Sequence, residues 1–175
     1  MTNMLLKLLS RPVAVLAGLT AISVVSLLAA LGSEVFLGLE PCILCVYQRF
    51  PYLAVIVFGT AGLALKKRFP PLPRLMIGVS GVTFLINSGI AFYHTGVEQK
   101  WWKSAVEGCA VPHFRDEPQS ILENILSAPT ANCAEIPWQD PILGLSMANY
   151  NVLLCFGLAV VCALSVYLLR RTHKG

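Results

Sequence analysis

The chain is poor in charged residues. Only 13% of its 175 residues are charged, whereas 56% are hydrophobic. A typical soluble domain has about 25% charged residues, so these proportions exclude an ordinary soluble domain. The formal net charge of +4 does not predict a partner nucleic acid either, because the basic residues flank apolar segments instead of forming a patch.

We also expect no cleavable signal peptide. Its first apolar segment is too long for the hydrophobic region of such a signal, and no small-residue cleavage site follows at a convincing distance. We therefore expect residues 1–31 to be retained, with the first span inside them. No internal repeat or low-complexity segment stands out.

Four apolar segments are long enough for membrane-spanning helices, which need about 20 residues each. They cover residues 12–31, 42–65, 75–93 and 147–169. Only one connection is long, the polar loop at residues 94–146. We predict an all-α membrane protein: one domain, residues 1–175, forming a four-helix transmembrane bundle with a single long loop.

Basic residues are concentrated on one side of these spans. Nine of the thirteen lie in the two terminal segments and the turn at 66–74, and all nine acidic residues lie in the other connections. Because short cytoplasmic loops are enriched in Lys and Arg, both termini are predicted to be cytoplasmic. The long loop then faces outward. Within it, Ser120 to Glu123 form a capping box before an apolar stripe, which predicts a short amphipathic helix, either on the membrane surface or packed on the protein.

A Cys-x-x-Cys motif stands at the outer start of the second span, as Cys42 and Cys45. Pro41 suits the first position of a helix, and a helix N-terminus stabilises a thiolate. The motif therefore predicts a redox pair at the membrane edge. Val46 replaces the His that attachment of c-type haem requires. No second Cys-x-x-Cys completes a zinc site. A zinc site that combines this pair with Cys109 and Cys133 is the alternative, but we expect no metal.

The long loop contributes two more cysteines to the same side, Cys109 and Cys133. Both lie in polar surroundings that we expect to be mobile. A static disulfide here would stabilise the fold by about 3 kcal/mol in the chain-entropy model. An exchangeable disulfide, open to a partner thiolate, is the alternative, and the nearby Cys42–Cys45 pair favours it.

Two polar side chains lie at the membrane edge near the first cysteine pair. Arg49 comes one helical turn after Cys45, so it either reaches lipid headgroups or donates to a bound oxidant such as a quinone. His94 ends the third span at a similar depth and is either interfacial or a second quinone contact. Cys155 and Cys162, seven residues apart in the last span, are interpreted as packing residues.

The segment from Pro41 to Arg49, the four spans and the two loop cysteines together resemble the bacterial disulfide bond formation protein B (DsbB) family. The similarity covers essentially the whole chain. One departure is Gln48, where some members carry an acid.

This resemblance implies a thiol:quinone oxidoreductase of the bacterial inner membrane with a periplasmic loop. It implies a partner, a DsbA-like periplasmic thiol oxidase of the thioredoxin fold, which is reoxidised for disulfide formation in secreted proteins. Cys109 would form the mixed disulfide with this partner, Cys133 would attack Cys42, and Cys45 would become the thiolate that passes electrons to ubiquinone or menaquinone. Arg49 and His94 would hold the quinone. A general partner and a dedicated one remain alternatives.

A different class of function remains open as well. The chain would then be a small membrane scaffold or a metal-binding module with a structural loop disulfide. That alternative predicts four inert thiols or a bound zinc ion.

Overall fold

We describe residues 8–106, 109 and 131–172 of the protein from a computed structural model. The amphipathic helix predicted after Ser120 lies outside these residues. Within them the regular structure is helical, with no strand. The helices are α2 (Pro12–Leu37), α3 (Ile43–Tyr47), α4 (Arg49–Ala64), α5 (Leu72–Glu98) and α7 (Met147–Thr172).

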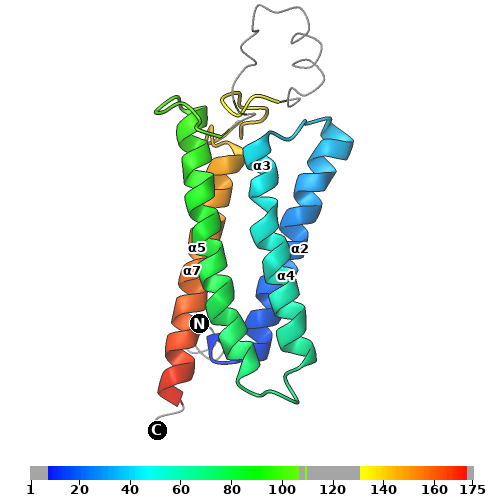
Figure 1. Cartoon of the computed structure of the whole chain (residues 1–175), viewed down its shortest axis with the longest axis vertical. Helices are drawn as coiled ribbons and strands as arrows, with labels where there is room; N and C mark the ends of the chain where they lie inside the picture. Colours follow the sequence, from blue (N-terminus) through cyan, green and yellow to red (C-terminus); the bar gives the residue numbers. More distant parts are fainter. Residues whose placement is uncertain (1–7, 107–108, 110–130, 173–175) are drawn as a thin grey trace, which may run out of the picture.

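The helices form a bundle of four rods, with α3 and α4 following one another along one rod (Figure 1). Each rod is long and apolar enough to cross a membrane. The start of α2 and the end of α7 lie at the same end of the bundle. The predicted all-α architecture with four spans is therefore confirmed, and the chain is a multi-pass membrane protein.

Three helices extend beyond the predicted spans, and α7 does so only by its last turn, to Thr172. α2 continues to Leu37 and α5 runs from Leu72 to Glu98, because spans chosen by hydropathy stop where polar residues begin although the backbone remains helical. As a result His94 lies within α5, one turn before its end, and not at the beginning of the loop.

The second span is interrupted at Gln48, which separates α3 from α4. Pro51 explains the interruption, because it has no backbone N–H to donate to the Tyr47 carbonyl. Gln48 keeps a helical backbone conformation (φ −68°, ψ −13°), so α3, which contains Cys45 and is capped by Cys42, continues along the same rod as α4.

The bundle packs around a core that the four rods share. α5 packs most extensively against α7, and α2 packs against α4. Phe84 and Tyr52 meet edge to face near the centre, with ring centroids 6.0 Å apart. Large apolar side chains such as Phe36 and Val57 are exposed on the outside, as expected for a surface in contact with lipid.

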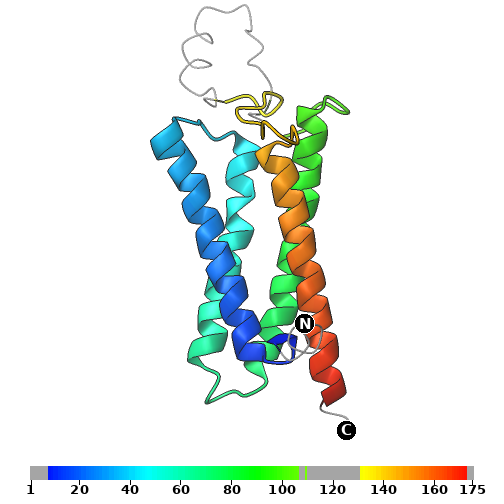
Figure 2. The same ribbon diagram turned by 180° about the vertical axis from the view of Figure 1, so that it is seen from behind.

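Residues 131–146 lie across the end of the bundle where α3 begins and α5 ends, as the two opposite views show (Figure 2). A second, smaller cluster of buried residues forms there, separate from the bundle core. This position brings the described part of the long loop onto the Cys-x-x-Cys motif.

Candidate redox site

The first cysteine pair lies at the start of α3, as predicted. Cys42 is the N-cap residue, and its sulfur accepts a hydrogen bond from the Cys45 backbone N–H at 3.3 Å. The two Sγ atoms are 2.8 Å apart, and both cysteines are free thiols. Pro41 was predicted to be the first helical residue, which is wrong: α3 begins at Ile43, because Cys42 adopts the extended backbone of an N-cap.

The loop cysteines are bonded to each other. Cys109 and Cys133 form a disulfide with Cα atoms 4.9 Å apart. The expected polar surroundings are wrong for both residues, which are 2% and 0% exposed. They pack in one cluster with Cys42 and Leu44 of the motif and Val97 of α5. The sequence does not show this burial, because the apolar partners come from other segments of the chain.

His94 joins the first cysteine pair from α5. Its Nε2 atom lies 3.4 Å from Cys42 Sγ, and the side chain is buried. On the other side of the ring, Nδ1 lies 2.9 Å from the side-chain nitrogen of Gln48. The contact with a sulfur was not anticipated from the sequence, which indicated only a similar depth for His94 and Arg49.

Hydrogen-bond donors converge on Cys42 and not on Cys45. Cys42 lies one residue ahead of the membrane span. The hydrogen bond from the Cys45 thiol, and then the His94 ring, lower the pKa of the Cys42 thiol despite its burial. The described state therefore favours negative charge on Cys42, whereas the family resemblance implied a thiolate at Cys45.

Arg49 forms an ion pair with Glu34, at the end of α2. Both side chains are partly exposed, at 19% and 25%. A guanidinium has five N–H donors, so the pair with one carboxylate leaves donors available. Glu34 thus pairs with Arg49 without occupying all its hydrogen-bonding capacity.

A cavity of about 610 Å³ connects these groups. It lies between α2, α4 and α7 under the described loop, and its lining is mostly apolar. Cys45, Arg49 and His94 all contribute to its wall. The structure therefore brings the two residues predicted to bind quinone into one cavity with the motif.

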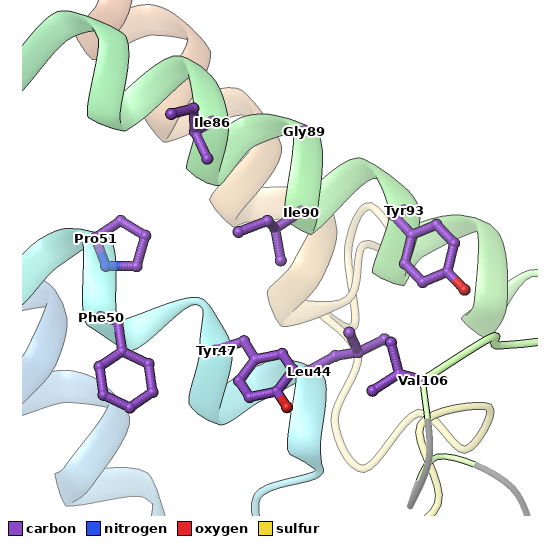
Figure 3. Close-up of a pocket in the computed structure, with 9 residues that line it drawn as sticks. All are labelled: Leu44, Tyr47, Phe50, Pro51, Ile86, Gly89, Ile90, Tyr93 and Val106. Atoms are coloured by element: carbon purple, nitrogen blue, oxygen red, sulfur yellow. The ribbon is translucent and has the colours of Figure 1, made fainter.

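A second hollow, of about 650 Å³, lies on the opposite side of α3 and α4, against α5 (Figure 3). Leu44 of α3, Phe50 of α4 and Ile90 of α5 line it. Its lining contains no cysteine and no charged residue. Its only side-chain donors are the hydroxyls of Tyr47 and Tyr93, and no cysteine borders it, so it is the weaker candidate for an oxidant site.

Sequence reasoning missed several polar residues of this site. Glu98 is buried one turn after His94, with its Oε1 atom 3.7 Å from His94 Nε2 and its Oε2 atom accepting from Ser146 at 2.5 Å. Asn151 contacts Gln48 from α7. The i, i+4 spacing of His94 and Glu98 was the available signal, whereas nothing local in the sequence indicates Asn151.

The same arrangement includes potential metal ligands. The ligand atoms of Cys42, Cys45 and His94 lie within 4.8 Å of one another. Two sulfurs and an imidazole are a donor set that zinc accepts. This set differs from the four thiols considered from the sequence, since the loop cysteines are bonded to each other.

Fold and site together define a membrane-embedded helical bundle in which a Cys-x-x-Cys pair and a loop disulfide are in contact. Comparison with known families agrees: residues 11–165 match the model of "Disulfide bond formation protein DsbB". The chain belongs to the DsbB family.

Individual relatives support this membership. A disulfide bond formation protein B of Xanthomonas axonopodis pv. citri is 32% identical over 144 residues, which are 79% of this chain and 81% of the relative. The protein of that name in Stutzerimonas stutzeri is 28% identical over 76% of this chain and 81% of its own. An uncharacterized protein of Rickettsia prowazekii, RP370, is 28% identical over 85% and 84%. No solved structure matches. The chain is thus an oxidoreductase of disulfide bond formation.

Proposed function

We propose that this protein reoxidises a DsbA-like periplasmic thiol oxidase and passes the electrons through its two cysteine pairs to a membrane quinone. The observation that carries the proposal is the contact between the pairs: Cys42, Cys109 and Cys133 lie in one buried cluster. Thiol–disulfide exchange requires a thiolate beside a disulfide sulfur, and this cluster supplies both.

The proposed relay conserves electrons at each step. A partner thiolate attacks Cys109, and Cys133 leaves as a thiolate. Cys133 then attacks Cys42 of an oxidised Cys42–Cys45 pair, and Cys45 leaves. The second partner thiol completes the partner's disulfide by displacing Cys109. When Cys109 in turn displaces Cys42 from Cys133, the loop disulfide is restored and two electrons and two protons reside on Cys42 and Cys45.

That last state has the same bonds as the structure, which holds a loop disulfide together with two free thiols in the motif. Further transfer from the motif needs an acceptor more oxidising than the partner, since DsbA itself has a potential of about −120 mV. A quinone supplies this chemistry by taking up two electrons and two protons.

The cavity beside Cys45 fits such an acceptor. Its mostly apolar wall suits a hydrophobic ring, while Arg49 offers hydrogen-bond donors to a carbonyl oxygen. His94 also reaches the cavity wall, although its ring nitrogens already contact Cys42 and Gln48. We assign Arg49 as the main quinone contact and His94 as a residue that acts on the cysteines.

We also propose the membrane in which the protein lies and its orientation there. The excess of basic residues at the termini and at 66–74 favours an inner-membrane protein with cytoplasmic termini. The cavity and both cysteine pairs lie at the opposite end of the bundle. The relay would then face the periplasm, where disulfides form.

The experiment mixes the purified protein with a reduced DsbA-like oxidase and either ubiquinone or menaquinone, and follows quinone absorbance. We expect one quinone to be reduced for each partner disulfide formed. Formation of partner disulfides without quinone loss under anaerobic conditions would contradict the proposed acceptor. Comparing a general oxidase with one encoded for a dedicated substrate distinguishes the two kinds of partner.

The grouping of Cys42, Cys45 and His94 favours one other function, metal binding. Metal analysis of the reduced protein distinguishes it from the relay. The relay predicts substoichiometric zinc and full turnover in the presence of a chelator. One zinc per chain, with turnover abolished in the metal-free protein, would support the metal-binding module instead.

A further inference from the structure

A chain of buried hydrogen bonds connects α5, α7 and α4 to the ring of His94. It begins at Asn87, whose Nδ2 atom donates to the backbone carbonyl of Gln48 at 3.2 Å and to Cys155 Sγ at 3.3 Å. A backbone carbonyl can only accept. The orientation of the Asn87 amide is therefore fixed by the main chain, and Cys155 is the acceptor in this contact.

The chain of hydrogen bonds continues into α7. Because Cys155 accepts from Asn87, its own S–H is available to Asn151 Oδ1, which lies 3.3 Å away. The Tyr52 hydroxyl donates to the same oxygen at 2.5 Å. Oδ1 of Asn151 thus accepts from both groups, and its Nδ2 atom faces Gln48.

The last two links reach the imidazole. Asn151 Nδ2 donates to Gln48 Oε1 at 2.6 Å, which leaves the Gln48 amino group facing His94 Nδ1 at 2.9 Å. An amide NH₂ can only donate, so Nδ1 must be the acceptor. A neutral imidazole that accepts at Nδ1 carries its proton on Nε2.

The proton on Nε2 then points toward Cys42 and Glu98. Cys42 Sγ lies 3.4 Å from this atom and Glu98 Oε1 lies 3.7 Å from it. Ser146 holds the other oxygen of Glu98. His94, Gln48, Glu98 and Asn87 are all buried, and both ring nitrogens lie against side chains of the protein.

We propose that Gln48 and Asn151 are positioning residues that hold His94 in the Nε2–H tautomer, so that the ring donates a hydrogen bond to the Cys42 sulfur. The expected effect of these residues on turnover rests on the proposed relay. The assignment of the tautomer does not depend on the relay. In the relay, Cys109 displaces Cys42 from Cys133, and the departing Cys42 sulfur takes the electron pair of the broken bond. A donor at that sulfur stabilises the thiolate as it leaves.

In this proposal Gln48 donates a hydrogen bond to His94 Nδ1. An acidic residue at position 48 would reverse the direction of that hydrogen bond. A glutamate at this position presents only acceptors when it is ionised, and would draw a proton to Nδ1. Nε2 could then accept instead of donating. Asn151→Asp should act in the same direction through Gln48: it removes the donor to Oε1, so the Gln48 amide turns over and its oxygen faces Nδ1.

The test is ¹⁵N NMR of histidine-labelled protein in lipid, at a pH where histidine is neutral. The chain has only three histidines, and His94→Asn identifies the signal of interest. We expect a protonated Nε2 in the wild type and a protonated Nδ1 in Gln48→Glu and in Asn151→Asp. Asn149→Asp is the matched control, because Asn149 accepts from Thr95 outside this chain of bonds, and should leave the tautomer unchanged.

Kinetics supply the second readout. Gln48→Glu should slow partner-driven turnover by about tenfold to a hundredfold, which corresponds to the loss of one hydrogen bond to a charged group, with an unchanged KM for the partner. A wild-type ring protonated on Nδ1, or a tautomer that stays the same in Gln48→Glu, would overturn the proposal. If the wild type shows the Nε2–H tautomer but reduces no quinone, the proposed function fails and the positioning role stands.

Discussion

Cys42 is the residue at which the parts of the site meet. Its sulfur contacts the Cys45 thiol and His94, and its side chain packs against the loop disulfide. The same sulfur is thus beside its redox partner, a hydrogen-bond donor and the second cysteine pair. This convergence explains how electrons could pass between the pairs without a large movement of the helices.

Reduced protein should retain a thiolate at Cys42 well below the ordinary thiol pKa of 9.0, because the Cys45 hydrogen bond and His94 lower the pKa of Cys42. Thiolate absorbance, followed as the pH is decreased, should therefore persist through neutral pH and disappear only as the pH falls through the lowered pKa. Cys45→Ala should move this loss to higher pH, and Cys162→Ala should not. A Cys42 that titrates near 9 in the wild type would refute the assignment.

Arg49→Ala should weaken the use of quinone far more than the use of the reduced partner. Loss of one hydrogen bond to a charged group costs about 1.5–3 kcal/mol, or roughly tenfold to a hundredfold in quinone kcat/KM. Arg49→Lys should recover only part of the loss, because Lys keeps the charge without the planar fork. Glu34→Gln should not impair quinone use, since Arg49 then loses only its competing partner.

The measurement is quinone KM and kcat with the reduced partner at saturation. If Arg49→Ala leaves both constants unchanged and raises the KM for the partner, Arg49 is a docking or headgroup residue. The quinone would then have to bind elsewhere than in the cavity beside Cys45.

At the scale of elements, α5 positions most of the site. It supplies Asn87, His94 and Glu98 from one buried side, and it packs along α7, which supplies Asn151 and Cys155. Close approach of the two helices depends on Gly81. A Cβ atom at this position would lie 2.8 Å from Cys162 Cβ, whereas one at Gly78 would meet nothing within 4 Å.

Gly81→Ala should therefore destabilise the bundle, by about 1–3 kcal/mol as is usual for overpacking. Gly78→Ala is the matched control and should be neutral or stabilising by about 1 kcal/mol, because Ala favours a helix over Gly. Thermal unfolding in detergent compares the two variants. Equal melting temperatures would show that α7 shifts freely and that its register with α5 is not fixed at this position.

The elements themselves could be predicted from the sequence because hydropathy alone selects membrane spans. The N-capping position of Cys42 was foreseen only approximately, and the interruption at Gln48 was not foreseen. The burial of Cys109 and Cys133 and the contact of Asn151 with Gln48 could not be predicted. Both depend on which segments distant in the sequence pack together, and a small number of buried polar residues leaves no periodic pattern to detect.

At the scale of the whole molecule, the chain separates its functions between the two ends of the bundle. The turn between α4 and α5 and the ends of α2 and α7 farthest from the cysteine pairs form one end, which is the basic end. The cavity and both cysteine pairs occupy the other end. A membrane protein with this division can bind a lipid-soluble oxidant from the bilayer while its cysteines face a soluble partner.

Reporter fusions should place the two ends in different compartments. We expect a cytoplasmic reporter to be active after residue 68 and after the C-terminus, and a periplasmic one to be active after Arg115. Weakening the charge bias, by neutralising Lys66, Lys67 and Arg68, should lower the fraction of correctly oriented chains. A cytoplasmic position for Arg115 would contradict the orientation and separate the cysteines from any periplasmic partner.

The central claim is that both cysteine pairs act in one relay, and partner-driven quinone reduction in a series of single cysteine variants tests it most directly. Ser in place of Cys42, Cys45, Cys109 or Cys133 should each abolish turnover, while Cys162→Ser, buried in the bundle core, should retain it. Partner binding should survive in Cys45→Ser, which confirms that the variant is folded. Full turnover in Cys109→Ser or Cys133→Ser would show that electrons bypass the loop disulfide, and the relay would be refuted.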